Sequence, residues 1–531
     1  MRKGTALGGV LAVITSVSAC AQIALRPTDF RHYVEMFRQQ ERLATGSLGR
    51  DSYEWIASNV PLFESSDADF TEMYYFRWYA FEKHVVQTEK YGTLITEWLP
   101  KPESADGAMG VLPDATPFHL REARWLRSLS IASDYAKYWL RPEADPWKYS
   151  EPLADAIYQV ALATGDMKPG RDRFPALVRY VQGWERQRDA NGLYWSIDTR
   201  DAMEKSISGD GYRPTLNSYM VGEARAMAAF TRDATQRAAY SRKADALADL
   251  VRSRLWNQHN VFYEVVSPAA DSGIRRQKKF VDPRTQLAFA NVREAIGFIP
   301  WQYGIATPEQ DVVWKQLFDP QGFDGRYGPT TAEKRHPRFR FESSDQCTWN
   351  GPMWPFATTQ MLTAAAELLN TRHTAYLDAE GYYKLFSRYV LAEHLSLKDG
   401  TRIPWIDEDR DADADDWITR RMLMEKNKQV GRGNYYNHSG FADPLITGLL
   451  GLRPNSSDTV HIHPLLPRGT WQYFALDGVP YHGHSLTLIY DETGKRYGRG
   501  SGFSLYVDGR LAAQRKDLGP LSAALKKRSS R

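Results

Sequence analysis

The stretch Ser218–Trp256, SYMVGEARAMAAFTRDATQRAAYSRKADALADLVRSRLW, contains the pattern that decides the fold. Apolar residues recur three and four positions apart over 218–232 and again over 238–256. This spacing places apolar side chains on one face of a helix, so the stretch predicts two consecutive amphipathic helices. The same pattern predicts further helices over residues 70–86, 119–140, 149–163, 174–187, 355–369 and 375–394.

The helical pattern extends from about residue 30 to about residue 452. A region of about 420 residues, at about 30 to 40 for each helix hairpin plus long loops, holds roughly a dozen helices. A dozen is the number needed for a closed ring of six hairpins. We therefore predict an all-α fold, an (α/α)6 toroid, over residues 21–453.

The period of the pattern changes to two after residue 452. Alternating residues over 459–463, 485–490 and 503–507 predict β-strands, and Asp508-Gly509 is a hairpin turn signal. We predict a small β-rich C-terminal domain over residues 454–515. Residues 516–531 are expected to form a frayed basic tail.

The composition is that of a globular protein with many aromatic residues. Of 531 residues, 42% are hydrophobic and 25% are charged, which excludes a disordered chain and a small disulfide-rich protein. The net charge of +4 is too small for a dedicated polyanion binder, so we expect no nucleic-acid partner. The 16 Trp, 29 Tyr and 22 Phe favour ligands with flat faces, such as sugar rings.

The N-terminus has the features of an export signal. A basic start at residues 1–3 precedes an apolar run over residues 6–17 that is too short to span a bilayer as a mature helix. Residues 17–20, Val-Ser-Ala-Cys, resemble a bacterial lipobox, whereas ordinary cleavage after Ala19 or Ala21 fits the same sequence. We predict a signal peptide at 1–20 and an exported protein, periplasmic or held at the membrane through a lipid on Cys20.

The only other cysteine is Cys347, so we expect no intramolecular disulfide. A packed small side chain is favoured over a catalytic thiol at this position. Two histidine pairs, His461 with His463 and His482 with His484, have the spacing that places both members on one face of a strand. Because no acid or cysteine completes a ligand set, we predict no metal site there.

The loop over residues 191–217 gathers carboxyl groups beside aromatic residues. Asp198, Asp201 and Glu204 lie within seven residues, next to Trp195 and before the helix that begins near Ser218. Burial beside aromatic groups raises the pKa of a carboxyl, which a general acid requires. The alternative is an acidic turn that caps the helix.

A second loop, residues 404–417, has seven acids in ten residues, bracketed by Trp405 and Trp417. An EF-hand match is poor because Ala414 and Arg420 occupy the positions that require Gly and Glu. Two further loops, 350–356 and 434–443, contribute aromatic and amide groups near helix starts.

Three of these segments resemble the motifs of one enzyme group. Residues 202–206, Ala-Met-Glu-Lys-Ser, are similar to the end of the Glu-Ser-Gly-Met-Asp-Asn-Ser loop of inverting glycoside hydrolases with the six-hairpin toroid. Residues 407–412 resemble the Gly-Glu-Asn-Tyr-Asn-Pro segment, and residues 351–355 look like the Gly-Pro-x-Trp loop of the same group. The group includes trehalases, processing α-glucosidases and mannosylglycerate hydrolases, and the resemblance is closest to the last of these.

The resemblance implies a mechanism with two carboxyl groups. Glu204, at the position of the family's Asp, would be the general acid, with Asp201 as the alternative acid, and Glu408 would be the general base. In such an inverting hydrolase the acid protonates the leaving oxygen and the base deprotonates a water on the opposite face of the sugar, with carboxyl groups about 6.5 to 9.5 Å apart. No metal or organic cofactor is required.

The expected substrate is a carbohydrate bound in a pocket, which favours exo action on a chain end. Candidate residues that stack on the sugar or read its hydroxyls are Trp195, Arg213, Asn217, Tyr219, Asn350, Trp354, Trp405, Tyr436 and His438. Two other functions remain open. A polysaccharide lyase on an α/α toroid would use Tyr435 or Tyr436 with His438, and a lipid-anchored carbohydrate-binding protein would have no activity.

Overall fold

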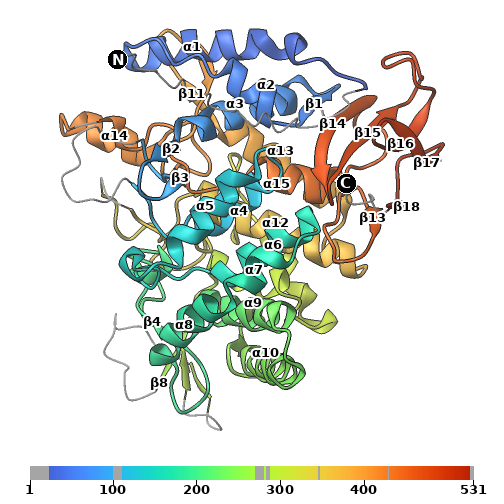
Figure 1. The fold of residues 1–531 in the computed structure, drawn as a ribbon. Helices are drawn as coiled ribbons and strands as arrows, with labels where there is room; N and C mark the ends of the chain where they lie inside the picture. Colours follow the sequence, from blue (N-terminus) through green and yellow to red (C-terminus); the bar gives the residue numbers. More distant parts are fainter. Residues whose placement is uncertain are drawn as a thin grey trace, which may run out of the picture.

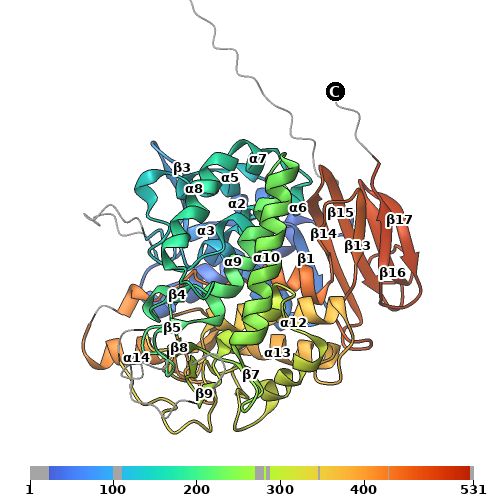
Figure 2. The ribbon, with the colours of Figure 1, turned by 90° about the horizontal axis from the view of Figure 1, so that it is seen from below.

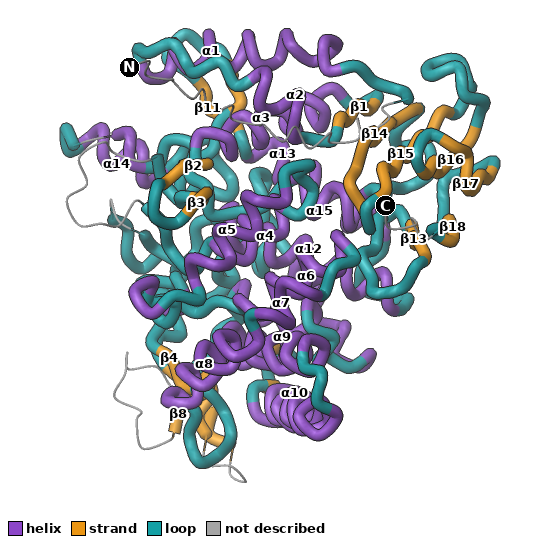
Figure 3. The backbone as a smooth tube through the Cα atoms, viewed as in Figure 1, coloured by secondary structure: helices purple, strands orange, loops and turns teal. Residues whose placement is uncertain are grey.

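The computed structural model describes residues 23–99, 110–268, 280–282, 287–344, 347–428 and 430–526. The predicted signal peptide and Cys20 lie outside these ranges. Helices fill the body of the molecule and the largest group of strands lies along one side (Figures 1 and 3). None of the helices in the described ranges combines the length and the apolar character that a bilayer span requires.

Most helices coincide with the predicted segments. They are α1 (Arg31–Thr45), α2 (Tyr53–Asn59), α3 (Ala68–Lys83), α4 (Thr116–Ala123), α5 (Leu129–Trp139), α6 (Leu153–Thr164), α7 (Lys168–Asp172), α8 (Phe174–Trp184), α9 (Pro214–Phe230), α10 (Ala234–Arg254), α11 (Ile299–Gln302), α12 (Pro355–Thr371), α13 (Ala379–Ala392), α14 (Ile418–Glu425) and α15 (Ala442–Pro444). The predicted helix over 119–140 is divided into α4 and α5. Between them Arg124 and Trp125 turn inward, and both side chains donate to Asp443 Oδ1, at 2.8 and 2.7 Å.

The helices form an inner and an outer layer. Each helix contacts the next one in the series α4, α6, α9, α11, α12, α13 and α3. Helix α9 is buried over nearly its whole length, whereas its partner α10 buries only the face that carries Ala244, Leu247, Ala248 and Val251. Figure 2 shows α10 on the outside of the molecule. Small and apolar residues on every face of α9 therefore suit it to the inner layer.

The C-terminal strands form an antiparallel sheet with a contribution from the N-terminal part of the chain. Its order is β1 (Leu62–Ser65), β14 (Tyr473–Tyr481), β15 (His484–Asp491), β16 (Gly502–Val507) and β17 (Arg510–Arg515). Asp508-Gly509 forms the predicted turn between β16 and β17. The backbone N–H groups of residues 23–25 all donate to Asp477 Oδ2 on β14, so the start of the described chain is attached to this C-terminal sheet.

The predicted tail requires a correction. Within residues 516–531, Leu521–Ala524 form strand β18, which pairs with β13 (Thr459–Ile462). Leu521 and Ala523 alternate with the exposed Ser522 and Ala524, which gives this short segment a partly buried face that a run of basic residues alone would not have.

The remaining strands are short and lie in the connections between helices. They are β2 (Val85–Thr88), β3 (Gly92–Ile95), β4 (Trp195–Ser196), β5 (Gly211–Tyr212), β6 (Trp256–Asn257), β7 (Phe262–Tyr263), β8 (Val266–Pro268), β9 (Phe280–Asp282), β10 (Leu287–Phe289), β11 (His394–Ser396) and β12 (Arg402–Pro404). The pair β4 and β5 brackets the loop that carries Glu204.

Candidate active site

A cavity of about 130 Å³ lies where the segments that precede five helices meet. Asp114 precedes α4, Tyr149 precedes α6, Glu204 precedes α9, Trp354 precedes α12 and His438 precedes α15, and all five line the cavity. The connections that lead into these helices therefore supply its walls. Residues more than 300 positions apart in the chain meet there only because the helices bring their N-terminal ends together.

The loop that carries Glu204 is held by buried polar contacts. Arg213 forms an ion pair of 2.6 Å with Asp201, and neither side chain is exposed to solvent. Glu294 accepts hydrogen bonds from the backbone N–H groups of residues 207 and 208, at 2.8 and 3.2 Å. The N–H of Trp349 donates to the carbonyl oxygen of Glu204 at 3.0 Å. These contacts limit the positions that the Glu204 side chain can take.

The backbone on both sides of Glu204 is in an uncommon conformation. Ala202 has a φ of +56° and Lys205 a φ of +61°, both in the left-handed region that residues other than glycine seldom adopt. Tyr435, beside the cavity residue Tyr436, has a φ of +58°. Such conformations cluster at functional sites, where the surrounding structure holds them in place.

Glu204 has the protonation behaviour of a general acid. Burial raises the pKa of its carboxyl to about 7, and the negative charges of Asp114 and Glu408 contribute to the rise. The carboxyl group therefore keeps its proton at mildly acidic pH, although an ordinary glutamate would be ionised. A proton held in this way at the wall of a cavity is available to a bound molecule.

Glu408 lies close by and is held by an arginine. Its two carboxyl oxygens accept from Arg432 Nε at 2.8 Å and Nη2 at 2.5 Å. Burial raises the pKa of Glu408 above its ordinary value, and the Arg432 charge opposes this rise. Glu408 does not line the cavity, but its charge contributes to the raised pKa values of Glu204 and Tyr436.

Two further carboxyl groups of the cavity, those of Glu97 and Asp114, were not predicted. Glu97 follows β3 and Asp114 precedes α4. Burial raises the pKa of Glu97 well above its ordinary value, and the Asp114 charge contributes, while the pKa of Asp114 rises to about 6. Two neighbouring buried carboxyl groups resist ionising together because their negative charges repel each other. Neither residue belongs to an acidic motif, so no local sequence signal marks them.

Several buried polar atoms of the cavity have no hydrogen-bond partner among the described residues. They are Glu97 Oε2, Asp114 Oδ1, Trp349 Nε1 and both ring nitrogens of His438. Buried polar groups in folded proteins are nearly always satisfied, so this concentration of acceptors and donors indicates a place for a polar ligand or water. Burial lowers the pKa of His438 well below its ordinary value, so the ring is neutral and offers one donor and one acceptor.

Flat aromatic faces form another part of the wall. Trp349 and Trp354 stack at 4.3 Å with an interplanar angle of 13°. His438 meets Trp354 edge-on at 5.6 Å, and Tyr436 meets His438 edge-on at 4.3 Å. The predicted residues that the structure brings together at the cavity are thus Glu204, Trp354, Tyr436 and His438.

The other predicted polar residues use their polar groups inside the fold. Arg213 and Asp201 are paired with each other, as described above. Asn217 exchanges hydrogen bonds with the backbone of Tyr194, at 2.8 and 2.9 Å. Asn350 Nδ2 donates to the carbonyl oxygen of Glu342 at 2.8 Å. These side chains support the loops and do not line the cavity.

The other predicted aromatic residues also lie away from the cavity wall. Tyr219 accepts from Gln360 Nε2 at 2.7 Å, and Trp405 is fully buried with its Nε1 3.3 Å from Asp407 Oδ2. Trp195 lies in β4. These aromatic residues were predicted because they lie beside or near acidic loops in the sequence. Whether they line the cavity depends on the direction of their side chains.

The acidic segment of residues 407–416 is occupied by basic partners. Asp413 pairs with Lys334 at 2.5 Å, Asp411 with Arg340 and Asp415 with Arg410. In the described part of the chain, no group of three or more His, Cys, Asp or Glu residues is placed to hold a metal ion.

Cavity, paired carboxyl groups and aromatic walls are features of an enzyme that acts on sugars, and comparison with known proteins agrees. Residues 109–439 match the model of the mannosylglycerate hydrolase MGH1-like glycoside hydrolase domain, and residues 452–513 match the C-terminal domain of glycosyl hydrolase family 65. The chain therefore contains a glycoside hydrolase domain. It belongs to the MGH1-like glycoside hydrolase family, whose model covers more than half of the chain.

Solved structures with similar folds include a protein described as a sialidase. It is 35% identical, with a TM-score of 0.83 over 94% of this chain and 45% of that one, so our chain spans less than half of its length. A GH63 mannosylglycerate hydrolase from Thermus thermophilus in complex with glucose is 11% identical (TM-score 0.46, covering 70% and 98%). A GH78 rhamnosidase of Bacillus sp. GL1 is 13% identical (TM-score 0.49, covering 84% and 41%).

Proposed function

We propose that the protein hydrolyses a glycosidic bond of its substrate with inversion of the anomeric centre. Glu204 donates a proton to the leaving oxygen, and Glu408 accepts a proton from the attacking water. The observation that carries the proposal is the Glu204 carboxyl, which lines the cavity and has a pKa raised to about 7. The Arg432 contact favours the ionised form that a base needs in Glu408.

The form and charge of the cavity favour exo action on a neutral sugar. The cavity is small and five inter-helix segments enclose it, which suits a single terminal residue better than a continuous polymer. Of the described residues that line it, Lys148 alone is basic, whereas Glu97, Asp114 and Glu204 are carboxylic. A substrate carboxylate would meet more acid than base in this cavity, so we propose a neutral terminal sugar.

The lyase alternative is disfavoured by the protonation of its proposed base. Burial raises the pKa of Tyr436 well above its ordinary value, and the charges of Glu97 and Glu408 add to the rise. A tyrosine that abstracts a proton needs the opposite shift. Tyr435 does not line the cavity, and burial raises its pKa above the ordinary value as well.

We further propose that the helices close into the (α/α)6 toroid and that the protein is exported. The contact series from α4 through α9 and α12 to α3, with inner and outer layers, supports the ring. The sequence of residues 1–21 supports export, with an anchor at Cys20 if the lipobox is used. The mass of the N-terminal peptide of the native protein distinguishes a lipid-modified Cys20 from simple cleavage.

The first product identifies the stereochemistry. Because a water occupies the face opposite the leaving group, we expect the first-formed sugar to have the anomeric configuration opposite to that of the substrate. Proton NMR of the reaction, started on a panel of aryl glycosides of neutral hexoses and deoxyhexoses, records this before mutarotation. A first product with retained configuration would exclude the proposed roles of Glu204 and Glu408.

The pH profile should show the two carboxyl groups in opposite roles. Glu204 must be protonated, so kcat/KM is expected to fall as the pH rises above about 7, the value to which burial raises the pKa of Glu204. Glu408 must be ionised, so kcat/KM should also fall at acidic pH, with a midpoint above that of an ordinary glutamate. Removing a neighbouring negative charge with Asp114→Asn should lower the pKa of Glu204 and move the alkaline limb to lower pH. An unmoved alkaline limb in that variant would mean that another group titrates there.

A further inference from the structure

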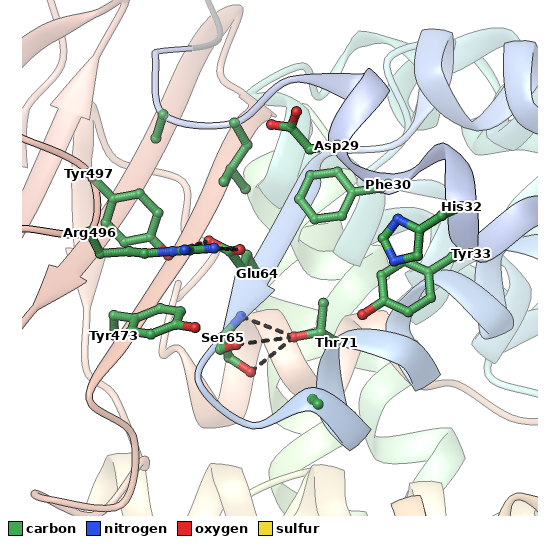
Figure 4. A pocket seen from close by; sticks show the side chains of 13 residues that line it. Asp29, Phe30, His32, Tyr33, Glu64, Ser65, Thr71, Tyr473, Arg496 and Tyr497 are labelled. Atoms are coloured by element: carbon green, nitrogen blue, oxygen red, sulfur yellow. Dashed lines mark hydrogen bonds and ion pairs between the residues drawn. The ribbon is translucent and has the colours of Figure 1, made fainter.

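A larger hollow, of about 490 Å³, lies between the N-terminal segment and the C-terminal sheet. Figure 4 shows its two walls, with Tyr473, Arg496 and Tyr497 on one side and Phe30 and Tyr33 on the other. Its bottom is formed by β1 and the start of α3. It shares no lining residue with the catalytic cavity, and its volume is within the range of about 300 to 1,000 Å³ typical of small-ligand sites.

The wall from the C-terminal domain is a rigid stack. The guanidinium of Arg496 lies over the Tyr473 ring at 4.9 Å, and the rings of Tyr473 and Tyr497 meet edge-on at 6.1 Å. Arg496 forms an ion pair with Glu64 of β1, and the Tyr497 hydroxyl donates to Glu64 Oε2 at 3.0 Å. These contacts hold the aromatic faces in place without a ligand.

The opposite wall is braced from behind. Tyr33 stacks on the buried Tyr75 at 5.4 Å with an interplanar angle of 15°, and Phe30 stacks on the same ring at 4.6 Å. His32 lies 4.2 Å from Tyr33, ring to ring. The hollow therefore presents preformed aromatic surfaces on both sides, which a sugar ring can contact at little cost in side-chain entropy.

The hollow also offers hydroxyl groups without internal partners. Neither the Tyr33 nor the Tyr473 hydroxyl has a hydrogen-bond partner among the described residues. Burial raises the pKa of Tyr33 to about 12, so the phenol remains a donor at all physiological pH values. Arg496 neutralises Glu64, which leaves the exposed Asp29 as the remaining carboxylate of the lining. Weak net charge, aromatic faces and free hydroxyls match a neutral polyhydroxylated ligand.

We propose that this hollow is a second, non-catalytic binding site for a neutral carbohydrate, formed jointly by the N-terminal segment and the C-terminal sheet. The proposal rests on the glycosidase class of the protein but not on the roles of Glu204 and Glu408. Such a site would retain a longer glycan on the enzyme while the end of that glycan is hydrolysed in the catalytic cavity.

The site can be tested with the full chain labelled with 3-fluorotyrosine, in the Glu204→Gln/Glu408→Gln background that prevents turnover. The probes are neutral trisaccharides of glucose, mannose and galactose at millimolar concentration. We expect at least one probe to shift the fluorine resonances that disappear in Tyr33→Phe and Tyr473→Phe. If none of the probes moves either resonance, the proposal is wrong.

The second measurement is the affinity for the trisaccharide. It is needed because variants without Tyr33 and Tyr473 lack the fluorine resonances that report binding. We expect Tyr33→Ala/Tyr473→Ala to weaken calorimetric binding of the shifting trisaccharide to the hollow about tenfold, since two aromatic faces are lost. Tyr490→Ala is the control, since Tyr490 is a half-buried tyrosine of the same sheet outside the hollow. Equal affinity in the double variant and the control would overturn the proposal. With Glu204 and Glu408 intact, the variant that lacks Tyr33 and Tyr473 should hydrolyse aryl glycosides at the parent rate. Activity therefore tests the roles of Glu204 and Glu408, whereas trisaccharide affinity tests the hollow.

Discussion

Glu204→Gln is expected to lower kcat about 10²- to 10⁴-fold on substrates with an alcohol leaving group. Glutamine occupies the same space in the cavity but has no acidic proton, so the leaving oxygen departs without protonation. The carboxyl is suited to this role because burial raises its pKa to about 7. Steady-state kinetics on an oligosaccharide or alkyl glycoside measures the loss, and a variant with more than about a tenth of the parent activity would contradict the assignment.

The leaving group separates the acid from the base. A glycosyl fluoride or dinitrophenyl glycoside departs without help from an acid, so Glu204→Gln should lose much less activity on these substrates. Glu408→Gln should lose activity on both kinds of substrate, because the attacking water still needs its base. Equal losses for both variants on both substrates would show that Glu204 does not act on the leaving group.

Glu97→Gln is a matched control in the same cavity. Burial and the Asp114 charge raise the pKa of Glu97 well above its ordinary value, so the native side chain is already neutral. An amide therefore preserves its charge, and we expect a much smaller loss than in Glu204→Gln. A loss as large as that of Glu204→Gln would make Glu97 the better candidate for the acid.

The parts of the fold that follow from local periodicity were predictable. Helix α9 spans Pro214–Phe230 and α10 spans Ala234–Arg254, close to the predicted 218–232 and 238–256. The break between α4 and α5 was not predictable, because it depends on hydrogen bonds to Asp443, some 320 residues away. Strand β1 likewise joins the sheet only through its pairing with β14. Contacts between distant segments determine both features.

In the candidate site, too, residues in local motifs were predictable and residues placed by distant contacts were not. Glu204 could be found because it lies in an acidic loop that resembles a known motif, and Trp354 because Gly and Pro residues surround it. Glu97 and Asp114 are isolated acids, and only the fold brings the segment after β3 and the segment before α4 to one cavity. Arg213 and Asn217 have the chemistry of ligand-binding residues, but the sequence cannot show that the loop itself uses their hydrogen-bonding groups.

Arg213→Met is expected to destabilise the protein by about 3 to 5 kcal/mol, the cost of leaving one member of a buried ion pair without its partner. Asp201 and Arg213 are both fully buried with an N···O distance of 2.6 Å, and Asp201 Oδ1 has no partner among the described residues even in the native structure. Loss of Arg213 also removes donors to Ser208 Oγ and the carbonyl oxygen of Gly209. Chemical denaturation with circular dichroism measures the free energy of unfolding.

Two further variants test whether the loss of stability in Arg213→Met comes from the buried ion pair. Arg213→Met combined with Asp201→Leu removes both charges, so it should recover part of the lost stability, because a buried ion pair can be replaced by apolar groups at small net cost. Arg31→Met breaks the exposed pair of Arg31 with Glu35, where water replaces the partner, and should leave the unfolding midpoint unchanged. Because the pair holds the loop of Glu204, the double variant should recover stability more than activity. Full recovery of kcat along with stability would show that the pair stabilises the fold without positioning the acid.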